Sequence, residues 1–242
     1  HRDLHSFPTR RSSDLERITD LSGNLRYAGI ENDLLDYIKN KEKNIPSRVL
    51  ALRIAESCRT DAIEDEIMNV LLDEKEHISV RKYAASFFIC SPNKDQKTKL
   101  LPFVLEDIPT DKDDEIKGLC MYALWPEHIS VSKLLSSITP KKDNRLIGAY
   151  DAFIETVLFE KIDRSSSIEA LDWYVKHFSD DSYPNYLLPK LLSKVTEERI
   201  YYKEMAAKIA SLLILLYGSK SSLINEEAFR AFRTKLLRNH EM

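Results

Sequence analysis

The sequence predicts an all-α protein, an α-solenoid of stacked helix pairs followed by an irregular helical subdomain. Three observations support this prediction. From Ile30 onward the apolar residues recur with the helical period. Similar segments return along the chain at intervals of 31 and 36 residues. Only 5 of the 242 residues are glycine, so few of the left-handed turns and bulges of a β-sandwich or barrel can form.

Six helices are expected in the first half of the chain, and their apolar positions span 30–38, 49–55, 63–71, 80–88, 100–104 and 116–124. Asp61, with Glu64 three residues later, is expected to cap the third helix, and the segment Ser91-Pro92-Asn93 to end the fourth helix and cap the fifth. An acidic cluster precedes the sixth helix. We expect it to complement the helix dipole and not to bind a metal, because consecutive side chains point in different directions. It comprises Asp111, Asp113, Asp114 and Glu115.

The second helices of the expected pairs resemble one another. Alignment of Val49, Val80 and Ile116 gives the two intervals, and helix pairs that recur in this way indicate an α-solenoid. Because the intervals are unequal, an irregular helical bundle is the alternative. The basic residues on these helices are our candidates for a concave binding face: Arg48, Arg53, Arg81, Lys82 and Lys117.

The second half keeps the helical period with different spacing. Helices are expected at 131–138 after a Ser130 cap, at 146–162, and at 168–178 after a Ser166 to Glu169 capping box. Three more are expected, between Pro184 and residue 195, at 198–217 and at 226–237. We therefore assign the helix pairs to residues 16–128, and to residues 129–242 a C-terminal helical subdomain that continues the solenoid.

The first residues do not fit this pattern. Residues 5–15 are similar to a translated DNA sequencing adapter, so residues 1–15 are expected to be a non-native disordered tail. A native basic, Ser-rich tail is the alternative. The adapter interpretation implies that the native protein extends upstream of about Glu16.

Patterns of catalysis are absent from the sequence. The glycines form neither of the phosphate-binding signatures G-x-x-x-x-G-K-[ST] and G-x-G-x-x-G, and no H-E-x-x-H or C-x-x-C occurs. We expect no catalytic residues, no cofactor and no metal site in this chain. The formal net charge of −3 makes nucleic acid an improbable partner.

The apolar and cysteine patterns bear on location. The longest apolar run, 212–217, falls far short of the ~20 residues of a membrane span. The three cysteines, Cys58, Cys90 and Cys120, are widely spaced, as in a reduced cytoplasmic protein. We expect a cytoplasmic location and no membrane partner.

The most distinctive stretch is Leu124-Trp125-Pro126-Glu127-His128, followed by Thr139-Pro140-Lys141 and Gly148-Ala149-Tyr150. This order resembles the HEAT-like helical repeat region of bacterial NACHT-type STAND NTPases, proteins similar to those of antiviral defence. We expect the motif residues to be structural, since prolines end helices and Gly148 allows the helix of Tyr150 to pack closely. They are Trp125, Pro126, His128, Pro140, Gly148 and Tyr150.

The resemblance implies a non-catalytic sensor or scaffold fragment of a larger NTPase that binds a protein or other macromolecular trigger. ATP and Mg²⁺ are then expected only in an upstream domain, and oligomerisation only in the full-length protein. Two alternatives stay open. One is a stand-alone HEAT-repeat adaptor. The other is a HEAT-like DNA glycosylase, which would need the basic residues of the second helices to converge on a concave face.

Overall fold

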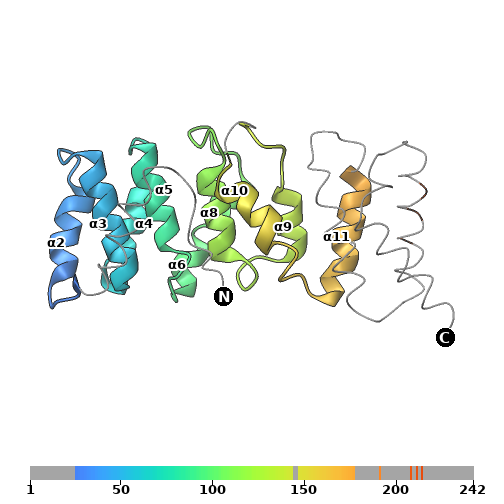
Figure 1. Cartoon of the computed structure of the whole chain (residues 1–242), viewed down its shortest axis with the longest axis horizontal. Helices are drawn as coiled ribbons and strands as arrows, with labels where there is room; N and C mark the ends of the chain where they lie inside the picture. The colour runs from blue at the N-terminus through green and yellow to red at the C-terminus, as the bar shows by residue number, and fades with distance from the viewer. Residues whose placement is uncertain are drawn as a thin grey trace. The chain divides into compact units, whose positions relative to one another are not determined.

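The computed structural model describes residues 25–143 and 147–177, with four isolated positions beyond them (Figure 1). Within these ranges the chain is helical and contains no strand, which confirms the predicted all-α class. The chain divides into two compact units. The first comprises His1–Leu124 and Lys142–Asp151, and the second comprises Trp125–Lys141 and Ala152–Met242.

The first unit contains three consecutive helix pairs. Helix α2 packs against α3, α4 against α5, and α7 against α8, while α3 contacts α5 and α5 contacts α8. Each second helix therefore packs on the second helix of the next pair (Figure 1). The elements are α2 (Ile30–Lys39), α3 (Ile45–Cys58), the 3₁₀ turn η2 (Asp61–Ile63), α4 (Glu64–Leu72), α5 (Ile78–Phe87), α6 (Lys94–Thr98), α7 (Leu101–Leu105) and α8 (Glu115–Leu124).

Local chemistry explains where these helices begin. The Asn44 side chain accepts a hydrogen bond from the Ser47 amide at the start of α3. The Nδ1 atom of His77 does the same for the Ser79 amide at the start of α5. Asn93 caps α6 as expected, by accepting from the amides of Asp95 and Gln96.

The expected cap at Asp61 is wrong. Asp61 lies inside η2, and no side chain caps α4. Glu64, the expected second member of the capping box, is buried at 3% exposure and accepts a hydrogen bond from the Ser91 hydroxyl instead. The Glu64 carboxylate therefore forms a tertiary contact with Ser91 and does not take part in a cap at the N-terminus of α4.

The register between the first two pairs also differs from the alignment of Val49 with Val80. The helix starts Ile45 and Ile78 are 33 residues apart, and the caps Asn44 and His77 have the same separation. The interval of 31 was thus two residues too short. The fifth predicted helix is also divided, into α6 and α7.

The second unit contains α9 (Val131–Ser137), a π-helical turn η3 (Phe153–Val157) and α11 (Arg164–His177). Ser130 caps α9 as predicted, since its Oγ accepts from the Lys133 amide. Helices α9 and α11 contact each other. The buried side chains of this unit include Leu134, Phe153 and Leu171.

Two helix predictions near the second unit need correction. The single helix expected at 146–162 is the short α10 (Ala149–Ala152) followed by η3. Helix α11 begins at Arg164 and not at Ile168, because Asp163 accepts from the Ser166 amide and takes the place of the expected Ser166 cap. The helices predicted at 184–195, 198–217 and 226–237, and the tail at 1–15, lie outside the described residues.

Gly118 permits a close approach of two backbone segments in the first unit. A Cβ atom at this position would overlap the backbone of Ala149 and Tyr150, so α8 and the start of α10 touch through their main chains. Gly148 has a related role, since a Cβ there would meet the Glu115 carboxylate. That carboxylate accepts from the Ala149 amide at 2.8 Å.

We predict that Gly118→Ala destabilises the protein by about 1–3 kcal/mol, because the methyl group forces two backbones apart. Urea denaturation followed by circular dichroism measures the change. Asn69→Ala, at an exposed position of α4, is the control and is expected to change stability by less than about 0.5 kcal/mol. Equal stability of the Gly118→Ala variant and the wild type would contradict the close packing.

Candidate functional site

The five basic residues proposed for a concave face occupy different environments. Three of them are buried, namely Arg48 (3% exposed), Arg81 (2%) and Lys117 (7%). Arg53 and Lys82 are half-buried. The first three therefore do not lie on an accessible face, which corrects the assignment made from the helical pattern.

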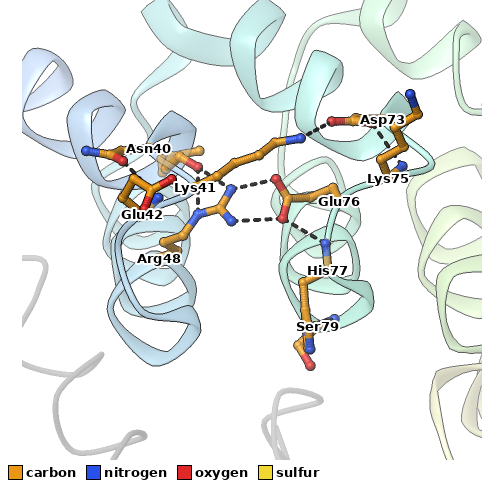
Figure 2. Close-up of polar contacts among 10 residues, drawn as sticks. Asn40, Lys41, Glu42, Arg48, Asp73, Lys75, Glu76, His77 and Ser79 are labelled. Atoms are coloured by element: carbon orange, nitrogen blue, oxygen red, sulfur yellow. Dashed lines mark hydrogen bonds and ion pairs between the residues drawn. The ribbon is translucent and has the colours of Figure 1, made fainter.

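Arg48 joins two consecutive helix pairs. Its Nε and Nη2 atoms donate to the carbonyl of Ile38, near the end of α2, at 3.1 and 2.8 Å. Its Nη1 and Nη2 atoms donate to the two carboxylate oxygens of Glu76, in the turn before α5, at 2.8 and 2.6 Å (Figure 2). The Arg48 guanidinium thus donates to a backbone carbonyl at the C-terminus of α2. It also forms a bidentate ion pair with a carboxylate in the turn of the following helix pair.

The Glu76 carboxylate is fixed as tightly as its partner. Its side chain is 4% exposed, and its Oε1 also accepts from the His77 amide at 2.7 Å. Burial would raise the pKa of Glu76, but the hydrogen bonds from Arg48 and His77 outweigh it and leave that pKa lowered. A second, more exposed link joins the turn between α2 and α3 to the turn before α5, where the Lys41 ammonium lies 2.7 Å from the Asp73 carboxylate (Figure 2).

Arg81 repeats this geometry in the next pair. It is the fourth residue of α5, as Arg48 is of α3, and its Nε donates to the Leu71 carbonyl near the end of α4 at 2.9 Å. Its Nη1 donates to the Thr110 hydroxyl, in the turn before α8, at 2.8 Å. The helix position of the arginine and its bond to a carbonyl ten residues earlier recur, whereas a hydroxyl group replaces the carboxylate in the following turn.

The turn between α7 and α8 contains the acidic cluster expected from the sequence. The Asp111 Oδ2 atom accepts from the Lys117 amide, and burial raises the pKa of Asp111. Asp113 pairs with Lys82 at 2.5 Å; burial opposes the charged form of Asp113, but Lys82 keeps its pKa lowered. These carboxylates therefore serve the helix terminus and the neighbouring α5.

Two lysines complete this region. Lys142 donates to the carbonyls of Ile108 and Asp111 and lies 2.7 Å from Asp107, so it holds the turn closed. Burial lowers the pKa of Lys117, whose ammonium lies 5.5 Å from the centroid of the Tyr150 ring. Lys117 is thus buried, and Lys142 is engaged by the turn between α7 and α8.

Arg53 and Tyr83 are half-buried residues of α3 and α5. The Arg53 guanidinium lies over the Tyr83 ring, 5.9 Å from its centroid, and so links α3 with α5. Beside them, the Ser86 hydroxyl donates to the Glu56 carboxylate at 2.8 Å. We define Arg53, Glu56, Tyr83 and Ser86 as the second-helix face.

The motif residues lie at or near the ends of α8, α9 and α10. Trp125 and Tyr150 are buried at 4% and 3% exposure, and the Trp125–Pro126 peptide bond is cis. Pro126 and Pro140 follow the ends of α8 and α9, respectively. His128 is half-buried, and Gly148 precedes α10 against the Glu115 carboxylate.

Sequence reasoning missed the partners of the buried arginines. Glu76 and Thr110 carry contacts between consecutive helix pairs but lie in turns, outside the helical pattern that we aligned. A usable signal was present, since Glu76 and Thr110 follow Arg48 and Arg81 by 28 and 29 residues. Such a separation suits a contact with the next helix pair.

Comparison of the chain with protein-family models, with curated proteins and with solved structures found no match. Over residues 25–143 and 147–177, no group of three or more His, Cys, Asp or Glu side chains is arranged to hold a metal ion. Across the same ranges, no helix combines the length and the apolar character needed to cross a bilayer.

We predict that Glu76→Ala destabilises the protein by about 3–5 kcal/mol, because it leaves the buried Arg48 charge without its counter-ion. Thermal and urea denaturation measure this loss. Asp36→Ala is the control, since it removes an exposed 3.4 Å pair with Lys43 and is expected to cost less than about 1 kcal/mol. Equal losses in the two variants would refute the importance of the buried pair.

The lowered pKa of Glu76 predicts a pH dependence. Because the folded pKa lies below the unfolded value of about 4.3, the contribution of Glu76 is complete above about pH 5. It is lost as the pH falls through the folded pKa. The stability gap between wild type and Glu76→Gln should therefore narrow from pH 6 to pH 3. A gap that is constant over this range would contradict the assignment.

Proposed function

We propose that this chain is a non-catalytic, HEAT-like helical-repeat segment that acts as the sensor or scaffold of a larger NACHT-type STAND NTPase. In this role it binds a protein or other macromolecular trigger. The ATP-hydrolysing domain lies elsewhere in the complete protein, and binding of the trigger to the repeats controls it.

The observation that carries the proposal is the recurrence of one junction geometry. Arg48 and Arg81 hold the same helix position, bond the same carbonyl position ten residues earlier, and reach the turn of the following pair. Nearest-neighbour contacts of this kind are typical of repeat proteins, whose stacked units create extended binding surfaces. The order of Trp125, Pro140 and Tyr150 adds the resemblance to the STAND repeat region.

The burial of charge supports a binding role over the DNA glycosylase alternative. That enzyme would need Arg48, Arg81 and Lys117 on a shared basic face, and all three side chains are buried. A stand-alone adaptor would use the same surfaces as a STAND sensor. The gene sequence upstream of Glu16 separates the two, since only the STAND protein has a P-loop there.

We expect the trigger to contact the second-helix face, because it combines a guanidinium, an aromatic ring and hydroxyl groups on adjacent helices. The double variant Arg53→Glu, Tyr83→Ala in the complete protein is predicted to abolish the trigger response. Plaque counts after phage challenge of bacteria carrying the complete gene measure it. Protection should fall at least tenfold, while circular dichroism shows that the variant is still folded at the temperature of the assay.

The matched control is the charge reversal Asp36→Lys on α2, at a side chain 63% exposed, which should leave protection unchanged. Full protection by the second-helix variant would exclude this face as the sensing surface. An upstream gene sequence without an NTPase domain would reject the STAND assignment and favour the adaptor.

A further inference from the structure

Arg81 is a buried cation whose charge has no counter-ion among the described residues. Its side chain is 2% exposed and donates two hydrogen bonds, to the Leu71 carbonyl and to the Thr110 hydroxyl. Both acceptors are neutral. Buried guanidinium groups are normally paired with an anion, because desolvation of an unpaired charge is costly.

The preceding helix pair shows what such a pairing looks like in this protein. Arg48, at the equivalent helix position, forms two hydrogen bonds with the Glu76 carboxylate in the following turn. Thr110 occupies the corresponding place for Arg81, with its Oγ1 2.8 Å from the guanidinium. The junction between Arg81 and Thr110 thus has a buried cation that donates a hydrogen bond to the following turn, but the acceptor in that turn carries no negative charge.

Each carboxylate near Thr110 contacts a group other than Arg81, while the buried Oδ1 atoms of Asp111 and Asp114 accept no hydrogen bond within the described residues. Asp113 pairs with Lys82 at 2.5 Å, and Asp111 accepts from the Lys117 amide at 3.0 Å. Asp114 accepts from the Lys142 amide at 2.9 Å and lies 3.4 Å from the Lys142 ammonium. Within the described ranges, none of these carboxylates is an ion-pair partner of Arg81.

Thr110 is also reachable from outside. It is an exposed residue in the turn between α7 and α8, and its hydroxyl accepts a part-buried hydrogen bond from the Arg81 guanidinium. Acidic side chains follow at Asp111, Asp113 and Asp114. A threonine in an exposed acidic turn suits protein kinases that select acidic sequences.

We propose that Thr110 is a phosphorylation site whose phosphate pairs with the buried Arg81 guanidinium. A protein kinase catalyses the reaction, and a nucleoside triphosphate is the phosphoryl donor. The Thr110 oxygen bonds to the γ-phosphorus, the bond from that phosphorus to the bridging oxygen breaks, and the nucleoside diphosphate leaves. The hydroxyl proton passes to a base of the kinase.

Phosphorylation would give the second junction the charge complement of the first. A phosphothreonine carries about −1.5 to −2 charges and strong acceptor oxygens, and Arg binds such groups through two parallel hydrogen bonds. The modified junction from α5 to the α8 turn would then match the junction formed by Arg48 and Glu76. Modification would stiffen the contact between the second and third helix pairs.

The test uses the chain with phosphothreonine incorporated at position 110. The melting temperature is expected to rise by about 2–4 °C. The Nε–H signal of Arg81 in ¹⁵N-resolved NMR spectra is expected to shift and to exchange more slowly with water. Phosphothreonine at Thr98, an exposed position of α6 whose hydroxyl bonds the Asp95 carbonyl, is the matched control and should change neither quantity.

An unchanged or lower melting temperature together with an unmoved Arg81 signal would overturn the pairing. The NMR readout uses the otherwise wild-type chain, so the test does not depend on the folding of an Arg81 variant. A second arm incubates the unmodified chain with ATP, Mg²⁺ and an acidic-sequence-selective kinase, followed by mass spectrometry. Phosphate at Thr110, absent from Thr110→Val, is expected, whereas phosphate only at other residues would overturn the site.

Discussion

The structure of the first unit depends on a buried guanidinium that ends one helix and holds the turn of the next helix pair. Arg48 satisfies the carbonyl of Ile38 and the carboxylate of Glu76 at the same time, so neither polar end is left unpaired in the interior. An α-helical pair cannot bury its apolar face alone, and a link of this kind fixes how the next pair is placed against it.

A buried arginine joins consecutive helix pairs at two places in the first unit, and the two places differ in the group that the arginine contacts in the following turn. Arg48 meets a carboxylate, whereas Arg81 meets the hydroxyl of Thr110. The second junction is therefore the one open to adjustment by added charge. Buried cations join the helix pairs, whereas the half-buried Arg53 lies over the Tyr83 ring and links α3 with α5.

Much of the fold follows from the sequence, because apolar periodicity and caps such as Asn93 and Ser130 are local signals. The caps predicted at Asp61 and Ser166 are not formed. Glu64, the expected partner of Asp61, accepts a hydrogen bond from Ser91 instead, and Asp163 accepts from the Ser166 amide at the start of α11. The prediction that Arg48 and Arg81 lie on an accessible face was wrong for a different reason. Helical position places Arg48 and Arg81 on the repeated second helices, but their long side chains reach inward to carbonyls that carry no sequence signal.

Amide hydrogen exchange of the Glu76→Ala variant tests most directly whether the buried guanidinium couples adjacent helix pairs. If it does, protection is lost across α2 and α3 as well as in α5, because Arg48 loses its anchor and the α2 terminus loosens with it. Increased exchange confined to the turn before α5, with α2 and α3 protected as in the wild type, would contradict the coupling.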